Sequence, residues 1–148
     1  MSLIQIDQSG RIEIPGETII AASNSFTVTV RITSQVQQSV RNKLLSRGVK
    51  PRMVMIRMFV AGIFMAIQKN MNNVHSVIID VEYPGYEDEI KSLLLEKIHA
   101  QGHWLSKHNI VIMSVGKKSP AHHAAIRVFR KQAKADYTPS VDELLSAC

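Results

Sequence analysis

The chain has 148 residues, of which 45% are hydrophobic and 20% are charged, which is the composition of one globular domain large enough to bury its own core. The formal net charge of +6 at pH 7 favours an anionic partner such as nucleic acid. The only cysteine is Cys148, which excludes an intrachain disulfide and a cysteine-ligated metal site.

The N-terminal part predicts three β-strands. Residues 3–7 alternate apolar and polar side chains and precede a Gln-Ser-Gly turn. Residues 18–23 and 26–32 are two further β-rich runs, separated by Asn24-Ser25 as in a hairpin. Three strands in such close succession predict an antiparallel meander.

Two helices are expected next. The first runs from an N-cap at Ser34 to about residue 47, with an apolar face of Val36, Val40, Leu44 and Leu45. The second begins at Pro51 and runs to about residue 70, and it is apolar on nearly all sides, so we expect it at the centre of the core. Its longest apolar stretch is far shorter than the roughly 20 residues that span a bilayer, which predicts no membrane partner.

The remaining elements alternate between strand and helix. A short apolar strand ends at Asp80, and later helices are expected to begin after Ser119-Pro120 and at the Ser140–Glu143 capping box. The expected ranges are strand 75–80, helix 87–101, strand 109–115, helix 121–133 and helix 140–145. The order β-β-β-α-α-β-α-β-α predicts an α/β fold, with a mixed five-stranded sheet and helices on both faces. We expect a single domain over residues 1–148, of which about 136–148 form a C-terminal extension.

This element order, with acids placed at strand ends, resembles the ribonuclease H-like superfamily, which includes Holliday-junction resolvases, integrases and ribonuclease H. In that superfamily an Asp on the first strand sits beside an acid at the end of the fourth, and the last helix supplies a third acid or His. Asp7, Asp80 and His122 match these positions. The segments 7–10, 80–85 and 116–122 also look like a group of small uncharacterised prokaryotic proteins.

The resemblance implies a catalytic set of Asp7, Asp80 and His122, with Mg²⁺ or Mn²⁺ held by these residues and by Glu82. Glu82 would lie on the same side as Asp80 if the strand continues through both. We favour His122 over His123, because neighbouring helical residues point about 100° apart and His123 leads toward a more solvated direction.

Phosphodiester hydrolysis needs an activated water and stabilisation of charge at phosphorus, which two Mg²⁺ ions about 3.5–4 Å apart can supply from carboxylate ligands. Lys117 and Lys118 precede the last long helix and would contact phosphate, next to a helix N-terminus that also favours anions. Each residue also has a simpler interpretation. The acids can be turn residues, the histidines capping or surface residues, and the lysines a solvated loop.

Residues 18–79 contain no acid at all, yet they carry eight basic residues, which suggests a nucleic-acid-binding surface that includes Arg41 and Arg47. The same gap removes the Glu that ribonuclease H takes from the helix after its third strand. The chain is therefore more similar to the resolvase branch, or to a member that has lost activity. Resolvase-like action implies a homodimer, with the apolar helix after Pro51 as one candidate interface.

The leading prediction is a metal-dependent nuclease acting on structured DNA or RNA. A non-catalytic nucleic-acid-binding or interaction module on the same fold is the alternative, and a small-molecule enzyme is a third reading. Residues 1–5 lack the pattern of a signal peptide, and this, with the single cysteine, predicts a cytoplasmic location.

Overall fold

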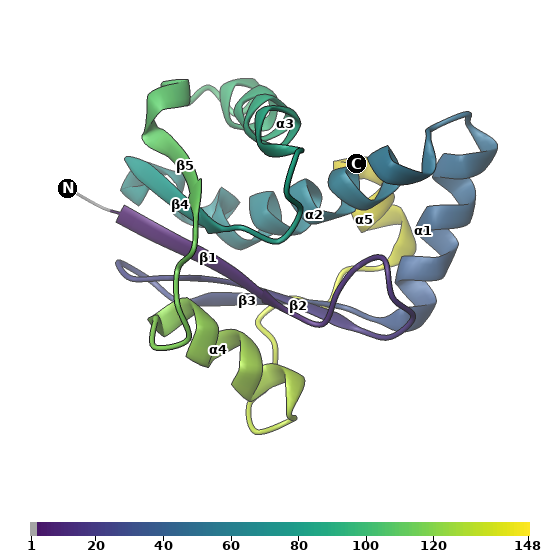
Figure 1. Ribbon diagram of the computed structural model, residues 1–148, viewed down its shortest axis with the longest axis horizontal. Helices are drawn as coiled ribbons and strands as arrows, with labels where there is room; N and C mark the ends of the chain where they lie inside the picture. Colours follow the sequence, from purple (N-terminus) through teal and green to yellow (C-terminus); the bar gives the residue numbers. More distant parts are fainter. Residues whose placement is uncertain (1–2) are drawn as a thin grey trace.

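The computed structural model describes residues 3–148 and contains one mixed five-stranded sheet (Figure 1). The strand order is β3-β2-β1-β4-β5. β1, β2 and β3 are antiparallel neighbours, whereas β4 and β5 run parallel to β1. This confirms the predicted α/β class and the mixed sheet. The strands are β1 (Leu3–Ser9), β2 (Thr18–Ser23), β3 (Val28–Ile32), β4 (Ser76–Asp80) and β5 (Ile110–Met113).

Helices cover both faces of the sheet (Figure 1). Between the sheet and α2 lies the larger core, whereas α4 packs on the opposite face, where Ile19 and Ala21 of β2 meet Ala125 and Val128. The alternation of side chains along each strand thus divides them between two separate apolar layers. The helices are α1 (Ser34–Ser46), α2 (Pro51–Ile67), α3 (Glu87–Ala100), α4 (Pro120–Phe129) and α5 (Val141–Ala147), with 3₁₀ turns at Gln68–Asn73 and Lys107–Asn109.

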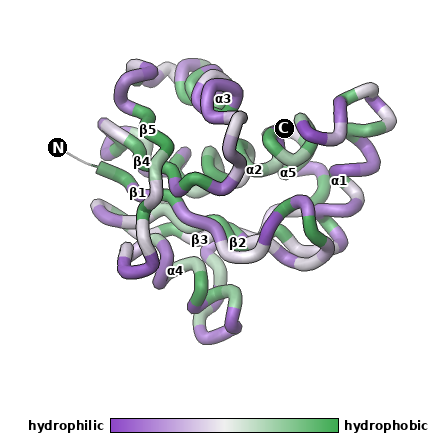
Figure 2. The backbone as a smooth tube through the Cα atoms, in the orientation of Figure 1, coloured by the Kyte–Doolittle hydropathy of each residue, from purple (hydrophilic) through white to green (hydrophobic). Residues whose placement is uncertain are grey.

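The helix α2 is the centre of the larger core, as its sequence predicts. Every residue from Met58 to Ile67 is buried, and Figure 2 shows hydrophobic residues gathered on this helix and the strands. Gly62 allows close approach to the sheet, because a Cβ there would collide with the Ile20 side chain. Residues 51–73 are long and apolar enough to cross a membrane, but 61% of their most apolar window is buried inside the fold, as in a core helix.

Several element boundaries differ from the expected ones. The N-cap of α1 is Thr33, whose hydroxyl accepts from the N–H of Val36, and not Ser34. Leu45 is 39% exposed, so it does not belong to the buried face of α1. The helix α4 ends at Phe129 rather than 133, because Lys131 adopts a left-handed φ of 60° that cannot continue the helix.

The C-terminal residues dock on the edge of the sheet. The Asp136 carboxylate accepts from the N–H of Thr29 at 2.8 Å, and the N–H of Arg31 donates to the Tyr137 carbonyl at 2.8 Å. These contacts cover part of the outer edge of β3, and α5 then packs against α1 and α2. The predicted capping box of Ser140 and Glu143 starts α5.

Candidate metal centre

The sheet register brings Asp7 and Asp80 together. Ile6 of β1 pairs with Ile79 of the parallel strand β4, and both isoleucines are fully buried in the core beneath α2. The next residue on each strand must point to the opposite face, so Asp7 and Asp80 project side by side toward the α4 layer. Asp7 is only 5% exposed, whereas Asp80 is half-buried.

Glu82 completes a group of three acids. The strand β4 ends at Asp80, so Glu82 reaches the group from the turn that follows and not from a continuing strand. Carboxylate oxygens of Asp7, Asp80 and Glu82 all lie within 4.8 Å of one another. We call these three side chains the carboxylate cluster. Hard carboxylate oxygens at such separations could hold a divalent ion of the Mg²⁺ or Mn²⁺ type.

His122 lies beside the carboxylate cluster at the start of α4. Ser119 caps the helix by accepting from the N–H of His122 at 3.1 Å, with Pro120 at the first position as predicted. The Nδ1 atom of His122 then lies 3.0 Å from Oδ2 of Asp7, while His123 is exposed. An ionised carboxylate can only accept, so this contact requires the proton on Nδ1 and leaves Nε2 as the basic nitrogen.

Backbone donors fix the two aspartates. The N–H of Gln8 donates to Oδ1 of Asp7 at 2.8 Å, and the N–H of Val115 donates to Oδ1 of Asp80 at 2.8 Å. The second contact ties the end of β4 to the loop between β5 and α4. Because that loop leads to His122, one carboxylate of the cluster also positions the element that carries the imidazole. Sequence patterns carry no signal for a backbone donor such as that of Val115.

The cluster destabilises its own negative charge. Burial, followed by the neighbouring Asp80 carboxyl and the Asp7 charge, raises the pKa of Glu82 to about 8. Burial also raises the pKa of Asp7, with a further contribution from the Asp80 charge, while the Gln8 N–H and His122 act in the opposite direction. Within residues 3–148, no Lys or Arg forms an ion pair with any of the three acids. A bound divalent cation would supply the missing positive charge.

Tyr83 anchors the turn that carries Glu82. Its ring is 4% exposed and packs edge-on against Phe59, with ring centroids 5.0 Å apart. Its hydroxyl accepts from Nε2 of Gln8 at 3.1 Å and from the N–H of Ile12 at 3.4 Å. Sequence reasoning did not identify Tyr83 or Gln8 as part of the site, although each directly follows a cluster residue along the chain.

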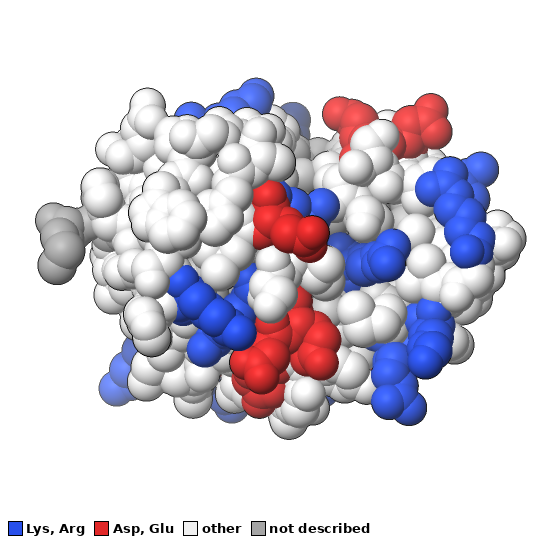
Figure 3. All heavy atoms as spheres, turned by 90° about the horizontal axis from the view of Figure 1, so that it is seen from above, with Lys and Arg blue, Asp and Glu red and all other residues white. Residues whose placement is uncertain are grey.

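The predicted basic contacts fall into two groups. Lys117 and Lys118 are exposed on the loop between β5 and α4, the loop that Asp80 anchors. Arg41 is half-buried instead, and its Nη2 donates at 2.7 Å to the Ile12 carbonyl, which also accepts from Nε2 of Gln37. Arg41 therefore stabilises the loop after β1 by a hydrogen bond. Arg47, the C-cap of α1, is exposed to solvent. On the face that Figure 3 shows, basic side chains form several separate groups with acidic ones between them.

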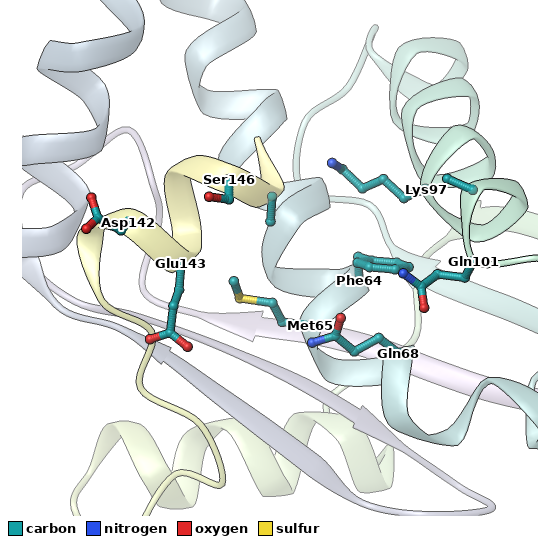
Figure 4. Close-up of a pocket in the computed structure, with 10 residues that line it drawn as sticks. Phe64, Met65, Gln68, Lys97, Gln101, Asp142, Glu143 and Ser146 are labelled. Atoms are coloured by element: carbon teal, nitrogen blue, oxygen red, sulfur yellow. The ribbon is translucent and has the colours of Figure 1, made fainter.

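A groove of about 550 Å³ lies elsewhere, between α2, α3 and α5. Figure 4 shows Lys97 on one side of Phe64 and Met65, and Asp142 and Glu143 on the other. The groove contains no member of the carboxylate cluster. Its polar side chains come from helix surfaces, and Glu143 is already engaged in capping α5.

The site therefore combines three carboxylates that can hold a divalent ion, one imidazole in contact with a carboxylate of the cluster, and two exposed lysines on an adjoining loop. Comparison of the chain with protein-family models, curated proteins and solved structures finds no match.

Proposed function

We propose that the protein is a metal-dependent nuclease that hydrolyses phosphodiester bonds in structured nucleic acid. The observation that carries the proposal is the carboxylate cluster, in which oxygens of Asp7, Asp80 and Glu82 lie within 4.8 Å of one another. Grouping one buried and two half-buried acids with no Lys or Arg partner is costly, and a divalent cation is the simplest compensation. The ion would be Mg²⁺ or Mn²⁺, because all three ligands are hard oxygens.

The sheet supports a ribonuclease H-like fold for this nuclease. Three antiparallel strands come first in the chain, and the fourth strand then pairs in parallel with the first. This pairing sets an acid on the first strand beside an acid at the end of the fourth, as the resemblance to that superfamily implies. His122 comes from α4, the last long helix, which is the third position of the same pattern.

Each residue has a role that follows from its position. The metal, when bound, would activate water and stabilise charge on the phosphate. Asp7, Asp80 and Glu82 would hold and orient it. His122 directs Nδ1 at Asp7, which leaves Nε2 as the ring nitrogen that would accept a proton from the attacking water. Lys117 and Lys118 would contact phosphates that flank the cleaved bond.

A non-catalytic nucleic-acid-binding module is the second candidate. Asp7 is almost completely buried, and its two oxygens already contact His122 and the N–H of Gln8. Those contacts would also suit a purely structural carboxylate. On this reading Asp7→Asn and Asp80→Asn leave nucleic-acid affinity unchanged or raise it, and neither variant alters the response to metal.

The test combines metal binding with cleavage. Purified protein is mixed with Mg²⁺ or Mn²⁺ and a four-way DNA junction, a DNA duplex or an RNA–DNA hybrid, and its thermal melting is followed with and without metal. We expect cleavage of at least one substrate and a metal-dependent rise in melting temperature, both lost in Asp80→Asn. Asp88→Asn is the matched control, because Asp88 is an exposed acid on α3 outside the cluster. Protein that neither cleaves any substrate nor melts higher with metal contradicts the proposal.

A cytoplasmic location and a homodimer belong to the same proposal. The free thiol of Cys148 suits a reducing compartment. Since residues 58–67 of α2 are buried within the chain, that part of the helix is occupied by the core, and a second copy would have to contact another surface.

A further inference from the structure

Trp104 is the most exposed large hydrophobic side chain in the part of the chain that the structure describes. It is 81% exposed, whereas the other exposed large hydrophobic residues in residues 3–148 range from 39% to 52%. It lies in the segment between α3 and β5, where the buried Leu105 follows it directly. Leaving an indole in water forgoes the largest apolar gain that a single side chain can make, so an exposed Trp indicates a contact surface.

The indole ring is held in one orientation. It stacks on the imidazole of His99, with ring centroids 4.7 Å apart and an interplanar angle of 4°. The imidazole is fixed in turn, because its Nε2 lies 3.1 Å from the Leu105 carbonyl and donates to it in the tautomer that this contact requires. The imidazole therefore lies against part of one indole face, and the rest of the ring is open to solvent. A ring ordered in advance loses little conformational entropy on binding.

The residues that flank Trp104 in the sequence indicate which kind of partner would suit it. No acidic residue occurs between Lys97 and Asp136, a stretch that also includes Lys117, Lys118 and His122. Close to the ring in sequence are His103, Lys107 and His108. The ion pair of Lys107 with Asp88 spans 3.6 Å between two well-exposed side chains, so it competes only weakly with a phosphate. An exposed flat ring in a segment of basic and uncharged residues fits a partner with both planar groups and phosphates.

We infer that Trp104 is a stacking platform for an unpaired nucleobase of single-stranded nucleic acid. The inference rests on the nucleic-acid partner of the proposed function and names the form of that partner. Every base offers a π-face, so stacking of this kind tolerates any sequence, while Lys107 is available to the adjoining phosphate. The interior of a fully paired duplex presents no such free base.

The intrinsic tryptophan fluorescence of the protein can report on this contact, because Trp104 is its only tryptophan. The probe is an oligothymidylate of about 12 nucleotides, within the range that single-strand-binding sites cover. It is added in the presence of EDTA, so that binding is measured without cleavage. We expect saturable quenching of the tryptophan fluorescence, with oligouridylate as the RNA arm. An abasic oligomer of equal length carries the same phosphates and should bind without comparable quenching.

Variants test whether the contact contributes to affinity. Trp104→Ala should weaken binding of labelled oligothymidylate about five- to hundredfold, as read by anisotropy, and Trp104→Phe should retain most of the affinity. Ile14→Ala is the matched control, because Ile14 is an exposed apolar residue on another loop. Its affinity should stay within about twofold of the wild type. Circular dichroism confirms that each variant is folded.

The outcomes separate this inference from the proposed nuclease. Quenching and weakened Trp104→Ala binding, in a protein that cleaves nothing with metal, support the platform and contradict the nuclease. Cleavage by a protein whose fluorescence does not respond to bound oligothymidylate overturns the platform alone. Equal quenching by the abasic oligomer, wild-type affinity in Trp104→Ala, or no binding of either oligonucleotide also overturns it.

Discussion

The Nδ1 atom of His122 lies 3.0 Å from Oδ2 of Asp7, across 115 positions of sequence. The contact joins the N-terminus of α4 to the central strand β1. Because Asp7 is 5% exposed, the imidazole replaces water that this carboxylate would otherwise need. One side-chain pair therefore links the stability of the fold to the geometry of the candidate metal centre.

Replacing His122 with Ala should destabilise the protein. The substitution leaves a buried carboxyl oxygen without its partner, which costs about 1–3 kcal/mol of the free energy of unfolding. Urea denaturation measures this cost. His123→Ala is the control, because His123 is exposed, and we expect a change within about 0.5 kcal/mol. Equal stability of the two variants would show that the His122–Asp7 contact contributes nothing.

The metal-free protein should become less stable as pH rises from about 5 to about 8. The pKa of Glu82 is raised to about 8 in the folded protein from an unfolded value near 4.5, so the folded state holds a proton that the unfolded state has lost. The stabilisation that the protonated Glu82 carboxyl provides is fully present below its unfolded pKa. It is lost as pH rises through its folded pKa. After allowance for solvent screening, we expect a loss of about 1–2 kcal/mol.

Urea denaturation at a series of pH values, with EDTA present, measures this dependence. Glu82→Gln cannot ionise and should flatten the curve over the same interval. Added Mg²⁺ should also oppose the loss, because a cation stabilises the ionised carboxylate. A wild-type curve that rises steadily between pH 5 and pH 8 would contradict the raised pKa.

Arg41 and Arg47 should behave differently when each is replaced by Ala. Arg41 donates at 2.7 Å to the Ile12 carbonyl, so its removal should lower the free energy of unfolding by about 1 kcal/mol. Replacing the exposed Arg47 should change the free energy of unfolding by no more than about 0.5 kcal/mol. It should instead reduce the affinity for nucleic acid. Denaturation and binding titrations of both variants provide the comparison, and a stability loss in Arg47→Ala alone would reverse the assignment.

Lys117 and Lys118 should contribute to binding through phosphate contacts. Each lysine that neutralises a phosphate releases a counterion, so removing both should reduce the slope of log affinity against log salt by about 2 for duplex DNA. Affinity measured at several salt concentrations gives the slope. The control is Lys69→Ala, since Lys69 lies 4.6 Å above the Tyr137 ring on another part of the molecule. If the variant that lacks both loop lysines shows the same slope as Lys69→Ala, the two lysines do not contact phosphate.

Local patterns predicted most of the elements because their causes are local. The cap at Ser119 with Pro120, the Ser140–Glu143 box and the all-apolar α2 each depend on residues within a few turns of chain. Errors arose where a distant contact or a backbone conformation decides. Leu45 follows the helical period but finds no core to cover it, and Lys131 ends α4 by its left-handed φ.

By itself, the sequence determined which residues are available for chemistry. It places Asp7 and Asp80 at or near the ends of apolar strands and His122 in the first turn of a capped helix, because strand period and capping are short-range effects. Only the tertiary structure decided that β1 lies between β2 and β4, because the pairing of β1 with β4 joins strands about 70 residues apart in the chain. That choice brings three carboxylates within 4.8 Å, and the burial that accompanies it raises the pKa values of Asp7 and Glu82. The exposure of Trp104 and its stacking on His99 are likewise consequences of packing.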